Sequence, residues 1–256
     1  LATGAQGVFE LANQFQQDDH DSAALSIRPD GRYLAMYSRH GSDTFTRWRI
    51  STNPRDPTAW GPEQTLTNGA GTTYNNTFLL PGENGGAGRT YNFTRATNYD
   101  PTVQVSTDNG STWTAAGKLL TEGGSSDRPY VRYAASQDRI FVFTTDRHPR
   151  DFANSMYCGI VQDGVLRRMD GSVADSSVFD AAGVPPSSLT RVFANGSTFN
   201  GTVMNRAWGT DIEVDATGNP VAIFTARAND SDLDHRFFYS RYDGQQWRNG
   251  GSTATN

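Results

Sequence analysis

Several features that define other protein classes are missing from this chain of 256 residues. Its one cysteine, Cys158, excludes an internal disulfide and a zinc site built on cysteines. No apolar run approaches the ~20 residues that a membrane-spanning helix needs, so we expect no membrane as a partner. The formal charge of −5 argues against a nucleic acid partner, because phosphate binding requires a basic surface.

Charged residues are also scarce, at 19%, whereas aromatic residues reach 11% and there are 26 glycines. This composition excludes an intrinsically disordered chain, which has few aromatics and a high net charge, and it excludes a coiled coil. The first residues, Leu1 to Gly4, have no Met, no basic start and no apolar segment. We therefore expect a mature or trimmed product without a signal peptide.

A β-rich run, a turn and a second β-rich run recur along the chain. In the first copy, Ala23–Ile27 and Tyr33–Tyr37 flank the turn Pro29-Asp30-Gly31, whose residues accept turn geometry. The copies begin near residues 22, 76, 129 and 210, and another strand follows each of them. The longest interval leaves room for a divergent unit around Leu189–Phe199. A period of about 50 residues made of short strands is typical of propeller blades.

We therefore predict an all-β fold, a β-propeller of four-stranded blades with about five blade-like units in one domain over residues 1–256. No long amphipathic helix is expected, since Pro185-Pro186 limits Ala181–Leu189 to a short one. Propellers have roughly 4–8 blades. The chain is thus either a small closed propeller or part of a larger one, such as a seven-bladed architecture lacking its closing blades.

One local motif supports the propeller. Residues Ser106–Trp113 fit the pattern S-x-D-x-G-x-x-W, the Asp-box of sialidase-like propellers. In this turn the Asp108 side chain accepts backbone N–H bonds, Gly110 takes a positive φ, and Trp113 packs between blades. The motif indicates architecture and is not itself catalytic.

The densest polar cluster, Asp18-Asp19-His20-Asp21, precedes the first strand, and His40 follows its partner strand. The hairpin places both histidines at the same rim of the blade, where two imidazoles flanked by carboxylates could provide a general base. The alternative is a capped loop with solvated acids. Asp18, Asp19 and His20 could also bind Ca²⁺ or Zn²⁺. We expect no metal here, because adjacent residues of an extended chain point to opposite faces.

Further polar and aromatic residues fall at strand entrances and exits. Tyr74 precedes a strand of the second copy and Arg95 follows its partner, which places them at the rim of His20 and His40. Later copies add five candidate substrate-binding residues, namely Arg128, His148, Arg150, Arg206 and Trp208. Arginine forks bind carboxylates or sulfates, and aromatic rings stack on sugars. The rim therefore indicates an anionic, ring-shaped ligand.

At these residues the chain resembles the BNR-repeat propeller polysaccharide lyases, the group of ulvan lyases and rhamnose–glucuronate lyases. The resemblance covers residues 15–248 and is carried by Asp18–Ala23, Arg28–Arg32, Tyr37–His40, Thr73–Asn75, Tyr91–Arg95, Arg128–Tyr130, Thr145–Arg150 and Trp208–Asp211. It implies β-elimination at a uronic acid, with His20, Tyr74 and His40 as active-site residues and Arg95 neutralising the carboxylate. Which of His20 and Tyr74 is the base is left open.

The resemblance also implies a secreted or periplasmic monomer that acts on an anionic polysaccharide. No cofactor is required for catalysis, although a structural Ca²⁺ or Zn²⁺ occurs in such proteins. Two other functions stay open. One is a sialidase-like glycoside hydrolase, which needs a placed carboxylate pair, or a tyrosine nucleophile with an acid partner, together with arginines. The other is a non-catalytic carbohydrate-binding propeller.

Overall fold

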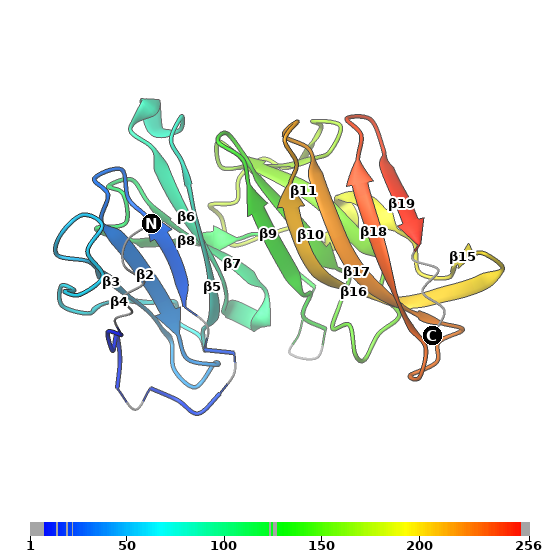
Figure 1. The fold of residues 1–256 in the computed structure, drawn as a ribbon, viewed down its shortest axis with the longest axis horizontal. Coiled ribbons are helices and arrows are strands. Elements are labelled where there is room, and N and C mark those ends of the chain that lie inside the picture. The colour runs from blue at the N-terminus through cyan, green and yellow to red at the C-terminus, as the bar shows by residue number, and fades with distance from the viewer. Residues whose placement is uncertain are drawn as a thin grey trace, which may run out of the picture. The chain divides into compact units, whose positions relative to one another are not determined.

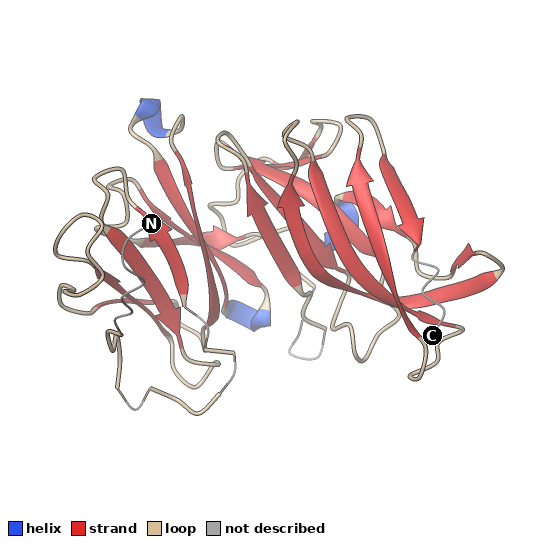
Figure 2. Ribbon diagram, viewed as in Figure 1, coloured by secondary structure: helices blue, strands red, loops and turns tan. Residues whose placement is uncertain are grey.

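The computed structural model describes residues 8–13, 15–18, 20–21, 23–122, 124 and 127–251. Asp19 and the predicted mature start, Leu1 to Gly4, lie outside these residues. The described part consists of strands and loops with three short 3-10 helices at Asn84–Gly86, Thr97–Tyr99 and Pro186–Ser188 (Figure 2). None of the described residues forms a helix long and apolar enough to cross a membrane. The all-β prediction is confirmed.

The chain divides into two compact units. The first comprises Leu1–Thr97 with Thr102–Ala115, and the second comprises Asn98–Pro101 with Ala116–Asn256. Each unit is described by itself. The prediction of a single domain over residues 1–256 concerns how the units combine, and it stays a prediction.

The first unit is built on two antiparallel sheets whose strands follow one another in chain order. One sheet contains β1 (Ala24–Ile27), β2 (Tyr33–Ser38), β3 (Phe45–Ile50) and β4 (Gln64–Thr67). The other contains β5 (Thr73–Leu80), β6 (Arg89–Arg95), β7 (Pro101–Ser106) and β8 (Thr114–Lys118), of which Pro101 and the last three residues of β8 are counted with the second unit. These are the four-stranded meanders of propeller blades, as predicted.

The second unit also has two sheets, in which neighbouring strands lie side by side (Figure 1). One contains β9 (Val131–Ala135), β10 (Ile140–Thr145), β11 (Met156–Gln162), β12 (Val165–Arg168), β13 (Val173–Asp175) and β14 (Thr190–Phe193). The other contains β15 (Ser197–Phe199), β16 (Thr202–Val214), β17 (Pro220–Ala228), β18 (His235–Tyr242) and β19 (Trp247–Gly251).

The four sheets agree with a chain of about five blade-like units, and they show where the divergent segment goes. Within Leu189–Phe199, β14 pairs with β11 of one sheet, whereas β15 pairs with β16 of the next. The segment therefore adds one strand to each of two sheets and forms no sheet of its own. Its two short strands are connected by three residues, too few for a separate blade.

Each unit has its own packed core. In the second unit, Phe193, Phe224 and Phe238 are at most 2% exposed and pack ring against ring, with centroids 5.2 to 5.8 Å apart. In the first unit, Trp113 packs with Leu34, Met36 and Trp48. Successive side chains of a strand point to opposite faces, and those on the inward faces form the interior. The polar residues at the strand ends are not part of this interior.

The turn at Ser106–Trp113 has the predicted bonds. The Asp108 carboxylate accepts the backbone N–H of Thr112 at 2.9 Å and the Ser106 hydroxyl at 2.7 Å. The indole N–H of Trp113 donates to the carbonyl of Gly110 at 3.2 Å, which holds the ring over the apolar cluster. The turn therefore orders one end of β7 and delivers the tryptophan to the interior of the first unit.

Gly110 provides a test of this packing. Its φ is +85°, and a Cβ would lie 2.6 Å from Cδ2 of Leu34. We expect Gly110→Ala to lower the free energy of unfolding by about 1–3 kcal/mol through backbone strain and crowding. Urea unfolding followed by tryptophan fluorescence measures it.

The matched control is Gly69→Ala. Gly69 has a similar φ of +71°, but nothing lies within 4 Å of the added Cβ. This variant should lose only the part of the free energy of unfolding that is due to backbone strain. Equal losses in the two variants would contradict the close contact between Gly110 and Leu34.

Candidate active site in the first unit

The first unit brings together all four residues predicted to take part in catalysis. His20 precedes β1, His40 follows β2, Tyr74 lies in β5, and Arg95 is the last residue of β6. The rings of His20 and His40 stack with centroids 4.2 Å apart and an interplanar angle of 15°. The Tyr74 ring lies 6.0 Å from His20 and 6.4 Å from His40. The convergence that the strand ends indicated is therefore observed.

Asp18 bridges the two imidazoles. Its Oδ1 lies 2.6 Å from Nδ1 of His20, and its Oδ2 lies 2.9 Å from Nδ1 of His40. The backbone N–H of His20 also donates to Oδ1 at 2.9 Å. The sequence indicated carboxylates near His20, but it did not show that a single one contacts both rings, because that depends on the path of the loop.

Tyr74 has an unusual backbone. Its φ is +62°, a conformation that is uncommon for a residue with a bulky side chain. The pairing of β5 with β6 shifts register between Thr73 and Asn76, which marks a β-bulge. A bulge redirects one side chain out of the strand's alternation, and strained positions of this kind gather at functional sites. The bulge therefore aims Tyr74 at the histidines.

Buried amides support the bulge from behind. Asn75 is 8% exposed and its amide donates to the Ser38 hydroxyl at 3.1 Å. Asn92 is fully buried and donates to Oδ1 of Asn75 at 2.9 Å and to Oε1 of Gln104 at 2.8 Å. The Oδ1 atom of Asn92 accepts the backbone N–H of Asn76 at 3.0 Å. Such a network fixes one backbone path on each side of Tyr74.

Arg95 connects the tyrosine to the second histidine. Its guanidinium carbon lies 4.8 Å from the centroid of the Tyr74 ring, and its Nη2 lies 3.3 Å from Nε2 of His40. The residue is 6% exposed, so its charge acts in an environment of lower dielectric than water. The guanidinium charge therefore lies beside the rings of Tyr74 and His40, largely withdrawn from bulk water.

Two carboxylates of the described residues near the histidines, Asp18 and Asp21, have opposite pKa shifts. The backbone N–H of His20, followed by the side chains of His20 and His40, holds the pKa of Asp18 far below its usual value. Burial raises the pKa of Asp21, and the negative charge of Asp18 adds to the rise. Both oxygens of Asp21 are buried. At neutral pH Asp18 is therefore an anion facing the imidazoles, whereas Asp21 is withdrawn from solvent.

Among the described residues, Asp18, His20 and His40 are the group whose donor atoms lie close enough to share an ion, within 4.8 Å of one another. Two ligands of a tetrahedral zinc ion at ~2.0–2.1 Å would be roughly 3.3 Å apart. The separation of 2.6 Å between Asp18 and His20 is that of a hydrogen bond to a charged acceptor. The geometry therefore fits a hydrogen-bonded triplet better than a zinc ligand set.

The five predicted substrate-binding residues belong to the second unit. His148 is 4% exposed, and its ring lies 4.9 Å from that of Tyr130, which in turn lies 5.9 Å from Trp208. Trp208 is 38% exposed, so this cluster of three rings, Tyr130, His148 and Trp208, reaches the surface. Tyr130 was not among the predicted ligands. Its position next to Pro129 at a strand entrance was the only signal for it.

The three arginines of that set have separate environments. The Arg128 guanidinium lies 5.7 Å from the Tyr99 ring centroid. The side chain of Arg150 is 70% exposed, with Nε 3.5 Å from Asp151. Arg206 sits at a bulge of β16 with φ +50°, and its Nε lies 2.6 Å from Asp230. Whether these residues share a site with His20 depends on how the units combine, and it stays a prediction.

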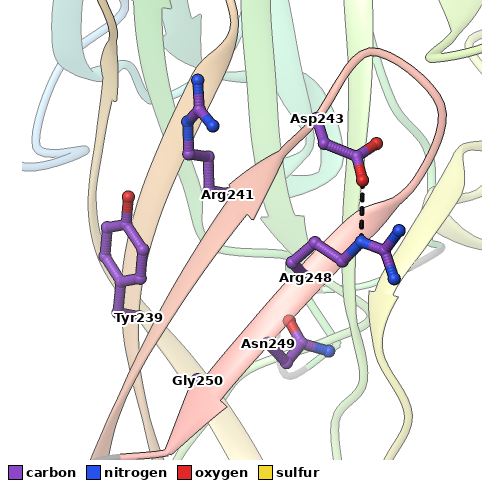
Figure 3. A pocket seen from close by; sticks show the side chains of 6 residues that line it. All are labelled: Tyr239, Arg241, Asp243, Arg248, Asn249 and Gly250. Carbon is purple, nitrogen blue, oxygen red and sulfur yellow. Dashed lines mark hydrogen bonds and ion pairs between the residues drawn. The ribbon is translucent and has the colours of Figure 1, made fainter.

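A shallow hollow of about 350 Å³ lies on β18 and β19, lined by Tyr239, Arg241, Asp243, Arg248, Asn249 and Gly250 (Figure 3). Its two guanidiniums are already matched by carboxylates. Arg241 lies 2.7 Å from Asp215, and Arg248 lies 2.7 Å from Asp243. The residues that line the hollow include no histidine, and both of its arginines are paired with carboxylates.

Comparison with known protein families decides the relationship. The model of the BNR repeat-containing family matches residues 4–253. The chain belongs to the BNR repeat-containing family. This agrees with the resemblance read from the motifs. A comparison with curated proteins gives no match.

Two solved structures show how this BNR-repeat chain compares in fold. An ulvan lyase, described as a new family of polysaccharide lyase and bound to -[GlcA(1-4)Rha3S]-, superposes with a TM-score of 0.67 at 18% identity. That match covers 91% of this chain and 58% of the lyase, so this chain spans little more than half of that length. An α-L-arabinanase from Penicillium chrysogenum superposes with a TM-score of 0.51 at 12% identity, and the match covers 91% of this chain and 67% of the arabinanase. These likenesses establish the propeller fold.

Proposed function

We propose that this BNR-repeat protein is a polysaccharide lyase that cleaves a uronic-acid-containing glycan by β-elimination. The observation that carries the proposal is the convergence of two imidazoles, a phenol and a guanidinium in the first unit. The stacked rings of His20 and His40 lie 4.2 Å apart, and the Arg95 guanidinium lies 4.8 Å from the Tyr74 ring. The bound ulvan lyase, with its glucuronate-containing ligand, supports the same class of substrate by analogy of fold.

The proposed reaction has three coupled parts. The Arg95 fork binds the uronate carboxylate and stabilises the negative charge that develops when the C5 proton leaves. Nε2 of His20 takes that proton as general base. The electron pair of the C5–H bond forms the C4–C5 double bond while the C4–O4 bond breaks. The phenol of Tyr74 protonates the departing O4.

A glycoside hydrolase is the second candidate, because the arabinanase shares the fold at a TM-score of 0.51. Hydrolysis through carboxyl groups needs one acid and one base or nucleophile, both facing the sugar. Asp18 is held by both histidines and keeps a very low pKa, so it is a poor general acid. Asp21 has a raised pKa, but its oxygens are buried away from any substrate. The pair therefore does not suit hydrolysis.

The activity is tested by incubating the protein with ulvan, gum arabic glycan, pectin and glycosaminoglycans. A lyase creates a 4,5-unsaturated uronate, which absorbs ultraviolet light, so absorbance should rise with at least one polymer. New reducing ends without this absorbance would indicate a hydrolase. Binding without new ends would indicate a carbohydrate-binding propeller.

We expect catalysis to be independent of metal ions. In this arrangement each imidazole Nδ1 donates to an Asp18 oxygen, and a protonated ring nitrogen cannot ligate a metal ion. Dialysis against EDTA should change the initial rate by less than about twofold, and added Zn²⁺ or Ca²⁺ should not increase it. A rate that falls to background and returns with one of these ions would show that the ion is required. A structural ion would instead reveal itself as a lower unfolding midpoint after dialysis.

The proposed substrate also bears on where the protein acts. An anionic polymer too large to enter a cell is degraded outside the cytoplasm, so the proposal includes secretion or export to the periplasm. The proposal also includes a monomer. Light scattering coupled to size-exclusion chromatography measures the oligomeric state.

A further inference from the structure

Asp18 is a shared acceptor for the two stacked histidines. It contacts Nδ1 of His20 and Nδ1 of His40 with different oxygens, at 2.6 and 2.9 Å. The three side chains are partly accessible, at 23% for Asp18, 40% for His20 and 29% for His40. The carboxylate thus holds the rings from one side while they remain open to solvent.

The chemistry of the donors fixes where the ring protons are. An ionised carboxylate only accepts hydrogen bonds, so each imidazole must present an N–H at Nδ1. A guanidinium only donates, so Nε2 of His40, which lies 3.3 Å from Nη2 of Arg95, must be an acceptor. Two independent contacts therefore assign His40 as the neutral tautomer with its proton on Nδ1.

The Asp18 contact places the same constraint on Nδ1 of His20, so Nε2 is the ring atom at which His20 would accept a proton. We propose that Asp18 is a positioning residue that sets one tautomer of both His20 and His40 through a single carboxylate, so that Nε2 of His20 carries the lone pair that accepts the substrate proton. This inference rests on the proposed lyase function for its kinetic consequence only. The tautomers themselves can be observed without substrate.

The charge balance of the cluster explains why one carboxylate serves two rings. Stacked rings 4.2 Å apart would repel one another if both were cations. Arg95 on β6 keeps His40 neutral, so the proton taken from the substrate resides on His20 and is balanced by Asp18. Among the described residues, Asp21, Arg39 and Tyr74 are further charged or titratable groups near the cluster. The pair therefore takes up one proton per turnover.

Asp18→Asn is the decisive variant because it keeps the shape. The amide oxygen can accept from one ring, but the amide nitrogen must donate to the other, which forces that ring into the opposite tautomer. We expect kcat to fall about 100-fold or more with KM changed less than about threefold.

Two further variants separate the positioning role of Asp18 from an effect on folding. Asp18→Glu keeps the carboxylate and should recover part of the lost rate. Asp30→Asn removes an ion-paired aspartate from the β1–β2 turn of the same unit, and it should leave kcat and the pH profile unchanged. Urea unfolding of each variant establishes that it is folded. If Asp18→Asn does not fold, Asp18→Glu and the wild-type tautomers still decide the question.

Nitrogen-15 NMR of the imidazoles reads the tautomers directly. The chain has four histidines, so His148 and His235 serve as internal references. We expect His20 and His40 to be protonated on Nδ1 in the wild type, and at least one to change in Asp18→Asn. Nε2–H tautomers in the wild type, or unchanged tautomers in the variant, would overturn the inference.

The NMR spectrum tests the role of Asp18 independently of the proposed lyase activity. If no polymer is cleaved, the lyase proposal fails, and the NMR result alone then decides whether Asp18 sets the tautomers. If a polymer is cleaved and the spectrum shows Nε2–H rings, the lyase proposal stands while the role of Asp18 is refuted.

Discussion

His20→Ala should lower kcat on the cleaved uronate polymer by about 10²–10⁴-fold, the usual contribution of a general base. Tyr74→Phe, which removes only the hydroxyl oxygen, should lower it by a similar factor because the departing O4 loses its proton donor. Both side chains lie in the cluster around Asp18, outside the apolar interior of the first unit. The unfolding midpoints should therefore change little. Initial rates of ultraviolet absorbance gain measure the effect.

The matched control for the first variant is His235→Ala. His235 is an exposed histidine on β18, in the second unit, and it has no place in the proposed chemistry. Its removal should leave the rate within about twofold. Full turnover by His20→Ala would refute the assignment of the base, and full turnover by Tyr74→Phe would refute that of the acid.

Arg95→Ala should lower kcat/KM by about 10²–10³-fold, since it removes the group that stabilises the developing negative charge of the uronate. The guanidinium is nearly buried and contacts both His40 and Tyr74, so the empty space would also disturb these rings. Arg95→Lys separates the two causes. It keeps the charge, loses the planar fork, and should recover only part of the rate.

Arg32→Ala is the control for a lost surface cation. Arg32 pairs with Asp30 at 2.7 Å in the turn before β2, and its side chain is 37% exposed. Its removal should leave kcat/KM unchanged. A substrate whose uronate carboxylate is methyl-esterified adds a second check, because Arg95→Ala should lose far less activity on it. Equal losses on the acid and the ester would contradict the proposed carboxylate contact.

The hairpins of the fold were predictable because their signals are local. Alternating apolar residues flank a Pro-Asp-Gly turn at residues 29–31, and the observed pairing of β1 with β2 surrounds that turn. The outer strands were not predicted. β4 has the sequence QTLT and is mostly exposed, and β8 has TAAGK, of which no residue is buried. Such segments become strands by pairing with a neighbour, so little of their structure is encoded as a hydrophobic period.

The site was predictable in outline and not in detail. Placing residues at strand entrances and exits was enough to bring His20, His40, Tyr74 and Arg95 to one end of two blades. The left-handed φ of Tyr74 was not foreseeable, because tyrosine rarely adopts it and the buried amides that stabilise it come from distant strands. The double contact of Asp18 depends on the rotamers of three side chains, which a sequence pattern does not specify.

The central claim is that the cluster eliminates across a C4–O4 bond and adds no water. It is tested most directly by digesting a defined uronate-containing tetrasaccharide and measuring the mass of every product. The account predicts that the masses of the two fragments sum to that of the substrate, with a double bond in the fragment that begins with the uronate. A sum that exceeds the substrate by one water molecule, with no double bond, would show hydrolysis and contradict the account.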